Sequence, residues 1–116
     1  MLMVQFGYIK HATSKSLTGP YIQDDDYFDG EKDRHEAPCA WQRIGSDGYV
    51  IMYDNYSRNP HNFGFVETKD FKTYNPVGYF DEVGKDMWRT NFSAQKHGGI
   101  VTVTRDELEM LIRHWE

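Results

Sequence analysis

The chain has 116 residues, a length that suits one modest domain, and a formal net charge of −5 with a pI near 5.5. We expect neither nucleic acid nor a membrane as a partner, because both favour clusters of basic residues that this acidic chain lacks. Cys39 is the single cysteine, so no disulfide framework is expected. No apolar run reaches transmembrane length, and residues 1–4 are too short and too lightly charged for a secretory signal, which leaves the cellular location open.

Aromatic residues are unusually frequent: 3 Trp, 8 Tyr and 7 Phe make up 16% of the chain. Aromatic side chains favour β-strands and pack well within sheets. Their rings also stack on the C–H faces of sugars, and aromatic-rich acidic chains are common among all-β proteins that act on carbohydrates. The composition therefore favours an all-β protein, with or without a carbohydrate ligand.

The N-terminal third predicts strands followed by an acidic loop. Residues 4–13 alternate roughly between apolar and polar, which predicts a strand, and the Thr-Gly-Pro at 18–20 predicts a turn before a short strand at 21–22. Residues 23–34 are polar and acidic, so we expect a loop. Its three contiguous aspartates at 24–26 do not have EF-hand spacing, which favours a solvated loop over a structural cation site.

A β-hairpin is expected next. Residues 36–44 and 49–53 are apolar-rich, and the Ser-Asp-Gly between them at 46–48 is a strong turn signal. Glu36 stands where the first strand begins, with the apolar Trp41 nearby. A carboxyl group in such a place is a candidate proton donor, and the alternative is a solvated loop glutamate.

The second half predicts further strands and one helix. We expect a loop at 55–62, a strand at 63–68, an edge strand at 73–80 because Pro76 has no N–H to donate, and an irregular segment at 81–91.

The C-terminal residues predict a strand and then a helix. The β-branched run after His97 predicts a strand over 97–104. Thr104 and Glu107 have capping-box spacing, which predicts a helix over 105–115. Its apolar residues share one face: Leu108, Leu111, Ile112 and Trp115.

A weak internal repeat links the two halves. The Phe-Gly-Tyr-Ile at 6–9, followed by residues 14–17, is echoed by the Phe-Gly-Phe-Val at 63–66, followed by residues 68–71, at an offset of about 55. A period near 50 in a β-rich chain with glycine-marked strands suggests the four-stranded blades of a β-propeller.

Five short motifs carry a resemblance to a known family. They are Ile-x-x-Ala-Thr-Ser-x-Ser-Leu-x-Gly-Pro-Tyr at 9–21, His-Glu-Ala-Pro at 35–38, Tyr-Val-Ile-Met-Tyr-Asp at 49–54, the strand and turn at 63–71, and Lys-His-Gly-Gly-Ile-Val-x-Val-Thr-x-x-Glu at 96–107. In these motifs and their order the chain resembles the C-terminal part of family 43 glycoside hydrolases, which include arabinofuranosidases, xylosidases and arabinanases with a five-bladed β-propeller.

The resemblance implies an all-β fold: a partial five-bladed propeller of roughly one and a half to two blades, with a short C-terminal helix. Residues 1–22 would end one blade, residues 35–80 would form a full blade, and residues 97–104 would be the first strand of the next blade, followed by the helix at 105–115. The whole chain would thus be one partial propeller domain.

The resemblance also implies roles for individual residues. Glu36 would be the general acid of an inverting glycosidase. His97 would lie near the propeller axis, close to the acidic site. Some members of the family hold a cation there, so a structural Ca²⁺ is an option, although the chemistry requires no cofactor. The ligand would be a plant-type pentose glycan. Contacts to it are expected from five residues: Trp41, Asp54, Trp88, Arg89 and His97.

The sequence departs from the family in one respect that bears on catalysis. The family places its base Asp near the start of the first blade and a pKa-tuning Asp in the blade before the acid. The matched motifs of this chain correspond to a part after both, and no Asp stands in its N-terminal strand; the first acidic residue is Asp24. We therefore expect an incomplete glycosidase that is inactive alone. Two alternatives are a carbohydrate-binding module that stacks sugars on Trp41, Tyr53 and Trp88, and a module that associates into a homo-oligomer through open strand edges.

Overall fold

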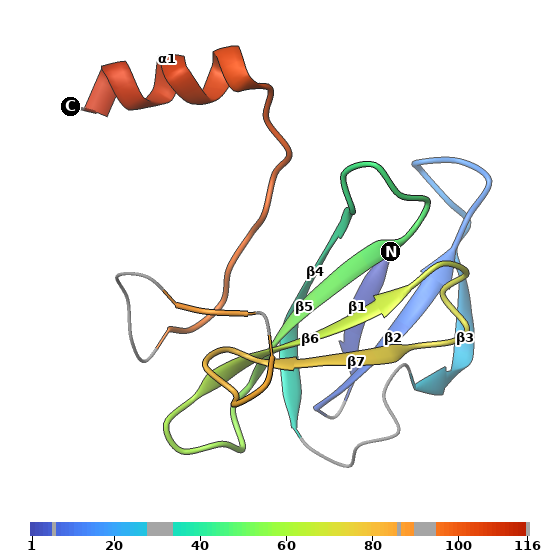
Figure 1. Ribbon diagram of the computed structural model, residues 1–116. Helices are drawn as coiled ribbons and strands as arrows, with labels where there is room; N and C mark the ends of the chain where they lie inside the picture. The colour runs from blue at the N-terminus through green and yellow to red at the C-terminus, as the bar shows by residue number, and fades with distance from the viewer. Residues whose placement is uncertain (6, 28–33, 86, 90–94, 116) are drawn as a thin grey trace.

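The computed structural model describes the chain except residues 6, 28–33, 86, 90–94 and 116, and folds it into two antiparallel sheets followed by one helix (Figure 1). The first sheet has the strand order β1 (Leu2–Gln5), β2 (Tyr8–Thr13) and β3 (Ile22–Tyr27). The second sheet is a four-stranded meander in the order β4 (His35–Gln42), β5 (Tyr49–Asn55), β6 (Asn62–Thr68) and β7 (Asn75–Tyr79). The all-β prediction is thereby confirmed.

Two N-terminal predictions were wrong in detail. The single strand expected at 4–13 is a hairpin of β1 and β2, with Gly7 in a turn at φ +82°. The acidic loop expected at 23–34 begins as strand β3 instead, because its residues pair with the edge of β2. Residues 28–33 of the expected loop lie outside the described part of the chain.

One hydrophobic core lies where the two sheets meet. Ile9 of the first sheet and Ile51, Tyr53, Val66 and Tyr79 of the second are all nearly or fully buried there. Tyr53 is only 4% exposed, so its predicted role as a sugar-stacking platform is wrong.

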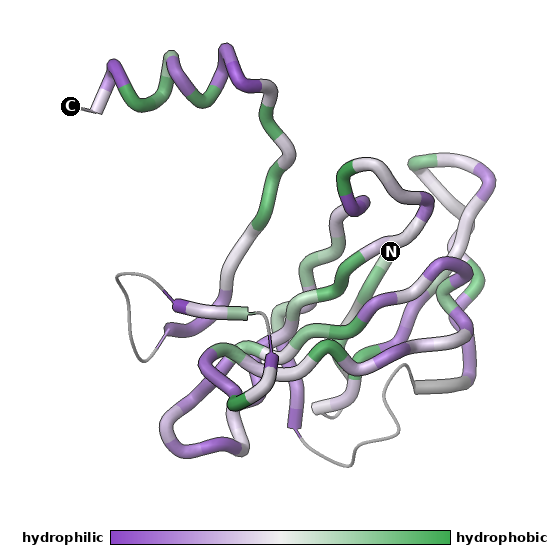
Figure 2. Tube along the Cα trace, viewed as in Figure 1, coloured by the Kyte–Doolittle hydropathy of each residue, from purple (hydrophilic) through white to green (hydrophobic). Residues whose placement is uncertain are grey.

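A second core covers the other face of the four-stranded sheet. Val50, Met52, Phe63 and Phe65 are buried on this face, and the half-buried Trp41 packs against them. Strands β5 and β6 are thus apolar on both faces, whereas Figure 2 shows hydrophilic residues in several of the connecting loops. This two-sided burial fixes the hairpin of β4 and β5 and the strand β6 as the sequence predicted.

A β-bulge interrupts β4. Cys39 pairs with Met52 on β5, but Glu36, three residues earlier, pairs with Asp54, only two residues later. The extra residue is accommodated by Ala37, whose φ of +47° is unusual for a residue with a Cβ. The bulge turns Glu36 onto the same face of the sheet as Asp54.

Replacing Ala37 by glycine is expected to raise the free energy of unfolding by about 0.5 kcal/mol, because relief of the left-handed strain outweighs the extra chain entropy that glycine brings. Ala40→Gly, on the same strand but without positive φ, is the matched control and should lower that free energy by about 0.5–1 kcal/mol. Urea unfolding of both variants measures the difference. Equal destabilisation by the two would contradict the assigned backbone strain.

The C-terminal part confirms the helix but not the strand before it. Residues 97–104 form no strand, because no described segment offers them a ladder of backbone hydrogen bonds, and β-branched composition alone does not replace one. The helix α1 (Arg105–Trp115) begins with the predicted capping box: Thr104 N donates to Glu107 Oε2 over 2.7 Å, and Glu107 N donates to Thr104 Oγ1 over 3.3 Å. Figure 1 shows α1 apart from both sheets, at the end of an extended segment.

The outer strand β7 forms one edge of the four-stranded sheet, where Pro76 predicted it. The segment expected to be irregular at 81–91 is irregular in its described residues, 81–85 and 87–89. The described part of the chain contains no helix with the length and apolar character that a membrane crossing requires.

Candidate functional site

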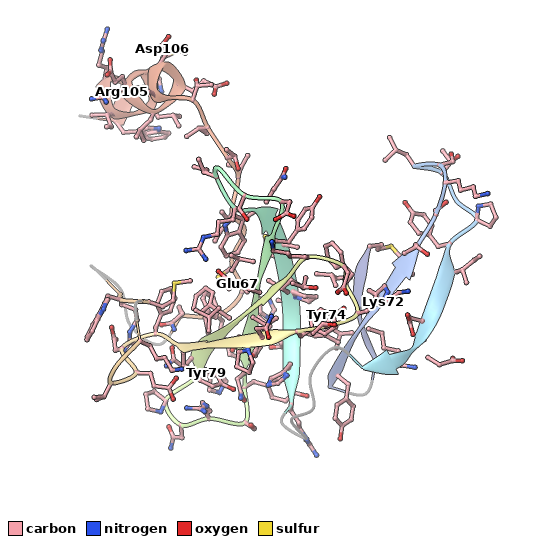
Figure 3. All side chains as sticks on the ribbon, turned by 45° about the vertical axis from the view of Figure 1, so that its right-hand side comes forward. Glu67, Lys72, Tyr74, Tyr79, Arg105 and Asp106 are labelled. Carbon is pink, nitrogen blue, oxygen red and sulfur yellow. The ribbon has the colours of Figure 1, made fainter. Side chains whose placement is uncertain are left out.

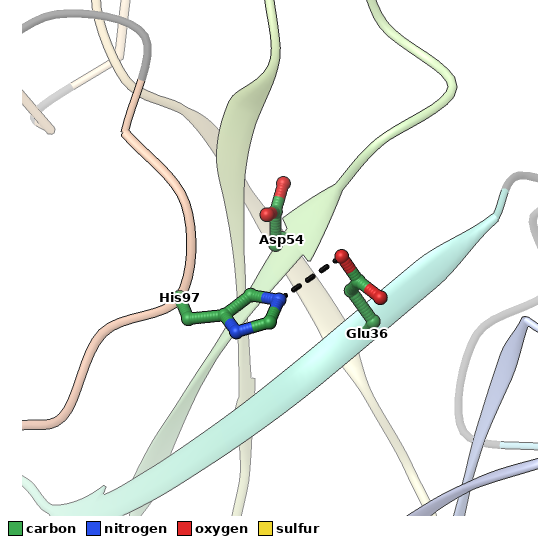
Figure 4. A group of neighbouring side chains, drawn as sticks. All are labelled: Glu36, Asp54 and His97. Carbon is green, nitrogen blue, oxygen red and sulfur yellow. Dashed lines mark hydrogen bonds and ion pairs between the residues drawn. The ribbon is translucent and has the colours of Figure 1, made fainter.

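Three ionisable side chains from distant parts of the sequence meet at one end of the four-stranded sheet (Figure 4). Glu36 comes from the start of β4, Asp54 from the end of β5, and His97 from the segment that precedes α1. One potential ligand atom from each residue lies within 4.8 Å of the others. We call this group the Glu36 cluster.

Glu36 and His97 are joined directly. The distance from His97 Nε2 to Glu36 Oε1 is 3.0 Å, and the side chains are 61% and 35% exposed, respectively. His97 has a φ of +52°, a left-handed conformation in which the backbone turns at this residue. The pair is therefore reachable from solvent while its geometry is fixed by a hydrogen bond.

Asp54 is the buried member of the cluster. It is 1% exposed, and neither carboxylate oxygen has a hydrogen-bond partner among the described residues. It also lies directly opposite Glu36 on the neighbouring strand, where two like charges repel each other. A buried, unpaired carboxylate beside a second carboxylate calls for positive charge, which protonated His97 or a bound cation could supply.

The segment that carries His97 is held beside β4 by a second contact. Ile100 N donates to Cys39 Sγ over 3.3 Å, and Cys39 is three residues after Glu36 just as Ile100 is three residues after His97. The two segments therefore run in the same direction. Cys39 acts here as a hydrogen-bond acceptor that positions the segment carrying His97.

Gly98 allows this segment to lie close against the sheet. A Cβ at this position would come within 2.9 Å of Met52 Cε and 3.2 Å of Phe63 Cε2. Those side chains belong to the second core, on the face that Asp54 shares. A glycine after His97 thus brings the imidazole over the buried carboxylate.

The other predicted sugar contacts lie outside this cluster. Trp41 packs on the second core and lines a surface hollow with Ile44 and the residues at 100–103. Trp88 is 63% exposed. Arg89 forms an ion pair with Asp81, and its backbone N–H and guanidinium together lower the pKa of the Asp81 carboxyl below its usual value.

A second polar group lies at the opposite end of the sheets, where β2 meets the turn before β7. His11 Nε2 is 3.3 Å from Asp24 Oδ2, and His11 Nδ1 is 3.4 Å from the hydroxyl of Tyr74, a residue that Figure 3 labels. Burial, followed by the nearby charges of Asp24 and Asp70, raises the pKa of Tyr74 to about 12. The Tyr74 hydroxyl therefore keeps its proton and donates a hydrogen bond to the Phe71 carbonyl over 2.8 Å. Its contact with His11 of β2 links the first sheet to the turn before β7.

Comparison of the chain with protein-family models, with curated proteins and with solved structures found no match.

Proposed function

We propose that the chain carries the acid-bearing part of a carbohydrate site of the glycoside hydrolase type, with Glu36 as the proton donor. The observation that carries this proposal is the Glu36 cluster itself: a half-exposed carboxyl group hydrogen-bonded to His97 and set against the buried carboxylate of Asp54. A proton donor must be reachable by a ligand and fixed in orientation, and Glu36 meets both conditions.

The arrangement of the sheets supports a partial β-propeller as the framework of this site. A four-stranded antiparallel meander is the unit of a propeller blade, and the second sheet has that form. Its first strand, β4, contacts both the first sheet and the segment at 97–100 that runs parallel to it. In a propeller the first strands of successive blades lie in this way around the axis, and Glu36 and His97 would then face that axis together.

In this proposal Glu36 gives a proton to the oxygen that leaves the sugar. Asp54 is not the matching base, because a buried carboxylate cannot reach a water on the far side of the sugar. Inverting glycosidases also keep the two carboxyl groups about 6.5–9.5 Å apart to leave room for that water. The described residues thus supply the acid half of the reaction, and the pentose glycan remains the proposed ligand.

Sugar binding tests this proposal independently of turnover. Arabino- and xylo-oligosaccharides are titrated into the ¹⁵N-labelled chain, and we expect chemical-shift changes at His97 and along residues 35–39. Glu36→Gln keeps the shape of the side chain and should weaken the changes without abolishing the fold. An absence of shifts with every oligosaccharide, or shifts confined to the far end of the sheets, would overturn the proposal.

The same three residues could instead hold a divalent cation, and the buried, unpartnered carboxylate of Asp54 favours this second candidate. One imidazole nitrogen and two carboxylates suit Zn²⁺ or Mn²⁺. Ca²⁺, which the resemblance to family 43 suggested, prefers six to eight oxygen ligands and would need several waters in addition. A cation here would neutralise the repulsion between Glu36 and Asp54.

Saturating Zn²⁺ is expected to raise the melting temperature of the chain by about 5 °C or more, because the cation binds the folded state alone. Asp54→Asn should abolish that shift and, without metal, should be no less stable than the parent because it removes the repulsion with Glu36. Asp106→Asn, at an exposed position of α1, is the control and should retain the shift. Calorimetry with Zn²⁺, Mn²⁺ and Ca²⁺ in parallel identifies the preferred ion. Equal shifts of the melting temperature in Asp54→Asn and Asp106→Asn would show that the cation does not bind at the Glu36 cluster.

A further inference from the structure

The helix α1 is left without a packing partner. None of its described residues is buried, and the segment at 99–104 holds it away from both sheets (Figure 1). Its apolar side chains are 45–81% exposed: Leu108, Leu111, Ile112 and Trp115. An 11-residue helix is marginally stable in water by itself, so its stability depends on a surface that covers this face.

The apolar residues form the pattern of a helix–helix seam. They recur at spacings of three and four residues, which places them in one stripe along the helix, and Figure 2 shows apolar and polar residues in alternation along α1. Met110 lies beside this stripe, 100° of rotation from Leu111, and lines a groove with it. The stripe is narrow, as in helices that pair with one other helix.

Charge along the helix indicates the direction of pairing. The first turn is acidic, with Asp106 and Glu107, and the last turn is basic, with Arg113 and His114. A second copy of the same helix in the antiparallel orientation brings each acidic turn against a basic one and also opposes the two helix dipoles favourably. The parallel orientation would place like charges together.

We propose that α1 pairs with α1 of a second copy of this chain, antiparallel, about a twofold axis near Leu111. Glu107 and His114 border the same groove, together with Val103, Met110 and Leu111. Their midpoint falls beside Leu111, so the twofold axis sets Glu107 of each copy near His114 of the other. A single helix pair buries less than the ~1,200 Å² of a standard interface, so the dimer is weak and forms as concentration rises.

Sedimentation equilibrium of the full chain over a range of concentrations tests the pairing. The weight-average mass should rise toward that of a dimer, and Leu111→Glu should weaken association roughly tenfold or more because it places a charge at the centre of the seam. Val83→Glu introduces the same charge at an apolar residue that is 95% exposed and lies outside α1, and it should leave association unchanged. A chain that stays monomeric, or one that associates equally well with Leu111→Glu, would overturn the proposal, and a monomer would mean that α1 docks elsewhere.

Cross-linking tests the orientation separately. In a Cys39→Ser background, Leu111→Cys places two cysteines at the axis and should form an intermolecular disulfide. Trp115→Cys places them roughly 12 Å apart along the helices, four residues from the axis in each copy, and should not cross-link. Efficient cross-linking through Trp115→Cys instead would indicate a parallel pair and overturn the antiparallel assignment.

Discussion

With azide supplied as the nucleophile, Glu36→Gln is expected to slow the cleavage of an alkyl pentoside by about 10²–10⁴-fold, the usual contribution of a positioned general acid. In the proposed reaction azide attacks the anomeric carbon, the bond from that carbon to the alkoxy oxygen breaks, and Glu36 gives its proton to the departing oxygen. The products are a glycosyl azide and the alcohol. Because azide needs no deprotonation, the reaction depends on the acid and not on a base.

The choice of leaving group provides the control for this prediction. A dinitrophenyl pentoside releases a stable phenolate that needs no proton, so Glu36→Gln should have little effect on its cleavage. Mass spectrometry of the glycosyl azide separates this reaction from background hydrolysis. If both substrates lost the same activity, or if neither formed an azide product with the unmodified chain, Glu36 would not be a general acid.

Gly64→Ala is expected to lower the free energy of unfolding by about 2–3 kcal/mol, which is a large loss for a domain of this size. A Cβ at this position would lie 2.5 Å from Cε2 and Cζ of Tyr53, its partner residue on β5. The Tyr53 ring cannot withdraw freely, because it is 4% exposed and packs against the rings of His35 and Tyr79 at centroid distances of 4.4 and 6.4 Å.

Urea unfolding of two further variants isolates this contact. Gly99→Ala adds a methyl group where no atom lies within 4 Å and should change the free energy of unfolding by less than about 0.5 kcal/mol. Gly64→Ala combined with Tyr53→Leu should lower the free energy of unfolding by less than the sum of the two separate losses, because leucine leaves room for the added methyl group. Strict additivity would show that the loss arises elsewhere.

Much of the fold could be predicted from local patterns. The Ser-Asp-Gly at 46–48 predicted the central hairpin, although its hydrogen-bonded turn lies just before, at 44–45. Pro76 predicted the edge position of β7, and the capping box at Thr104 predicted the start of α1. These features depend on a few neighbouring residues. The prediction of a strand at 97–104 was wrong, because a strand forms only beside a partner strand at hydrogen-bonding distance, and no local pattern shows whether one is present.

The candidate site was predicted in its members but not in its assembly. Glu36, Asp54 and His97 were each named, and the resemblance implied that His97 lies close to the acid, but no pattern in the sequence placed Asp54 beside them. If the pairing of Cys39 with Met52 continued without a bulge, Glu36 would pair with Asn55 and its side chain would lie on the other face of the sheet from Asp54. The bulge at Ala37 corrects the register by one residue, and Ala-Pro is too weak a signal to predict it.

Both outer strands of the four-stranded sheet contain a proline: Pro38 in β4 and Pro76 in β7. A proline offers no N–H to an incoming strand, and the bulge at Ala37 bends β4 away from the flat form that templates fibril growth. Neither edge therefore favours the stacking of copies strand upon strand into amyloid. At both edges of this sheet, the sequence itself therefore opposes aggregation through strand pairing.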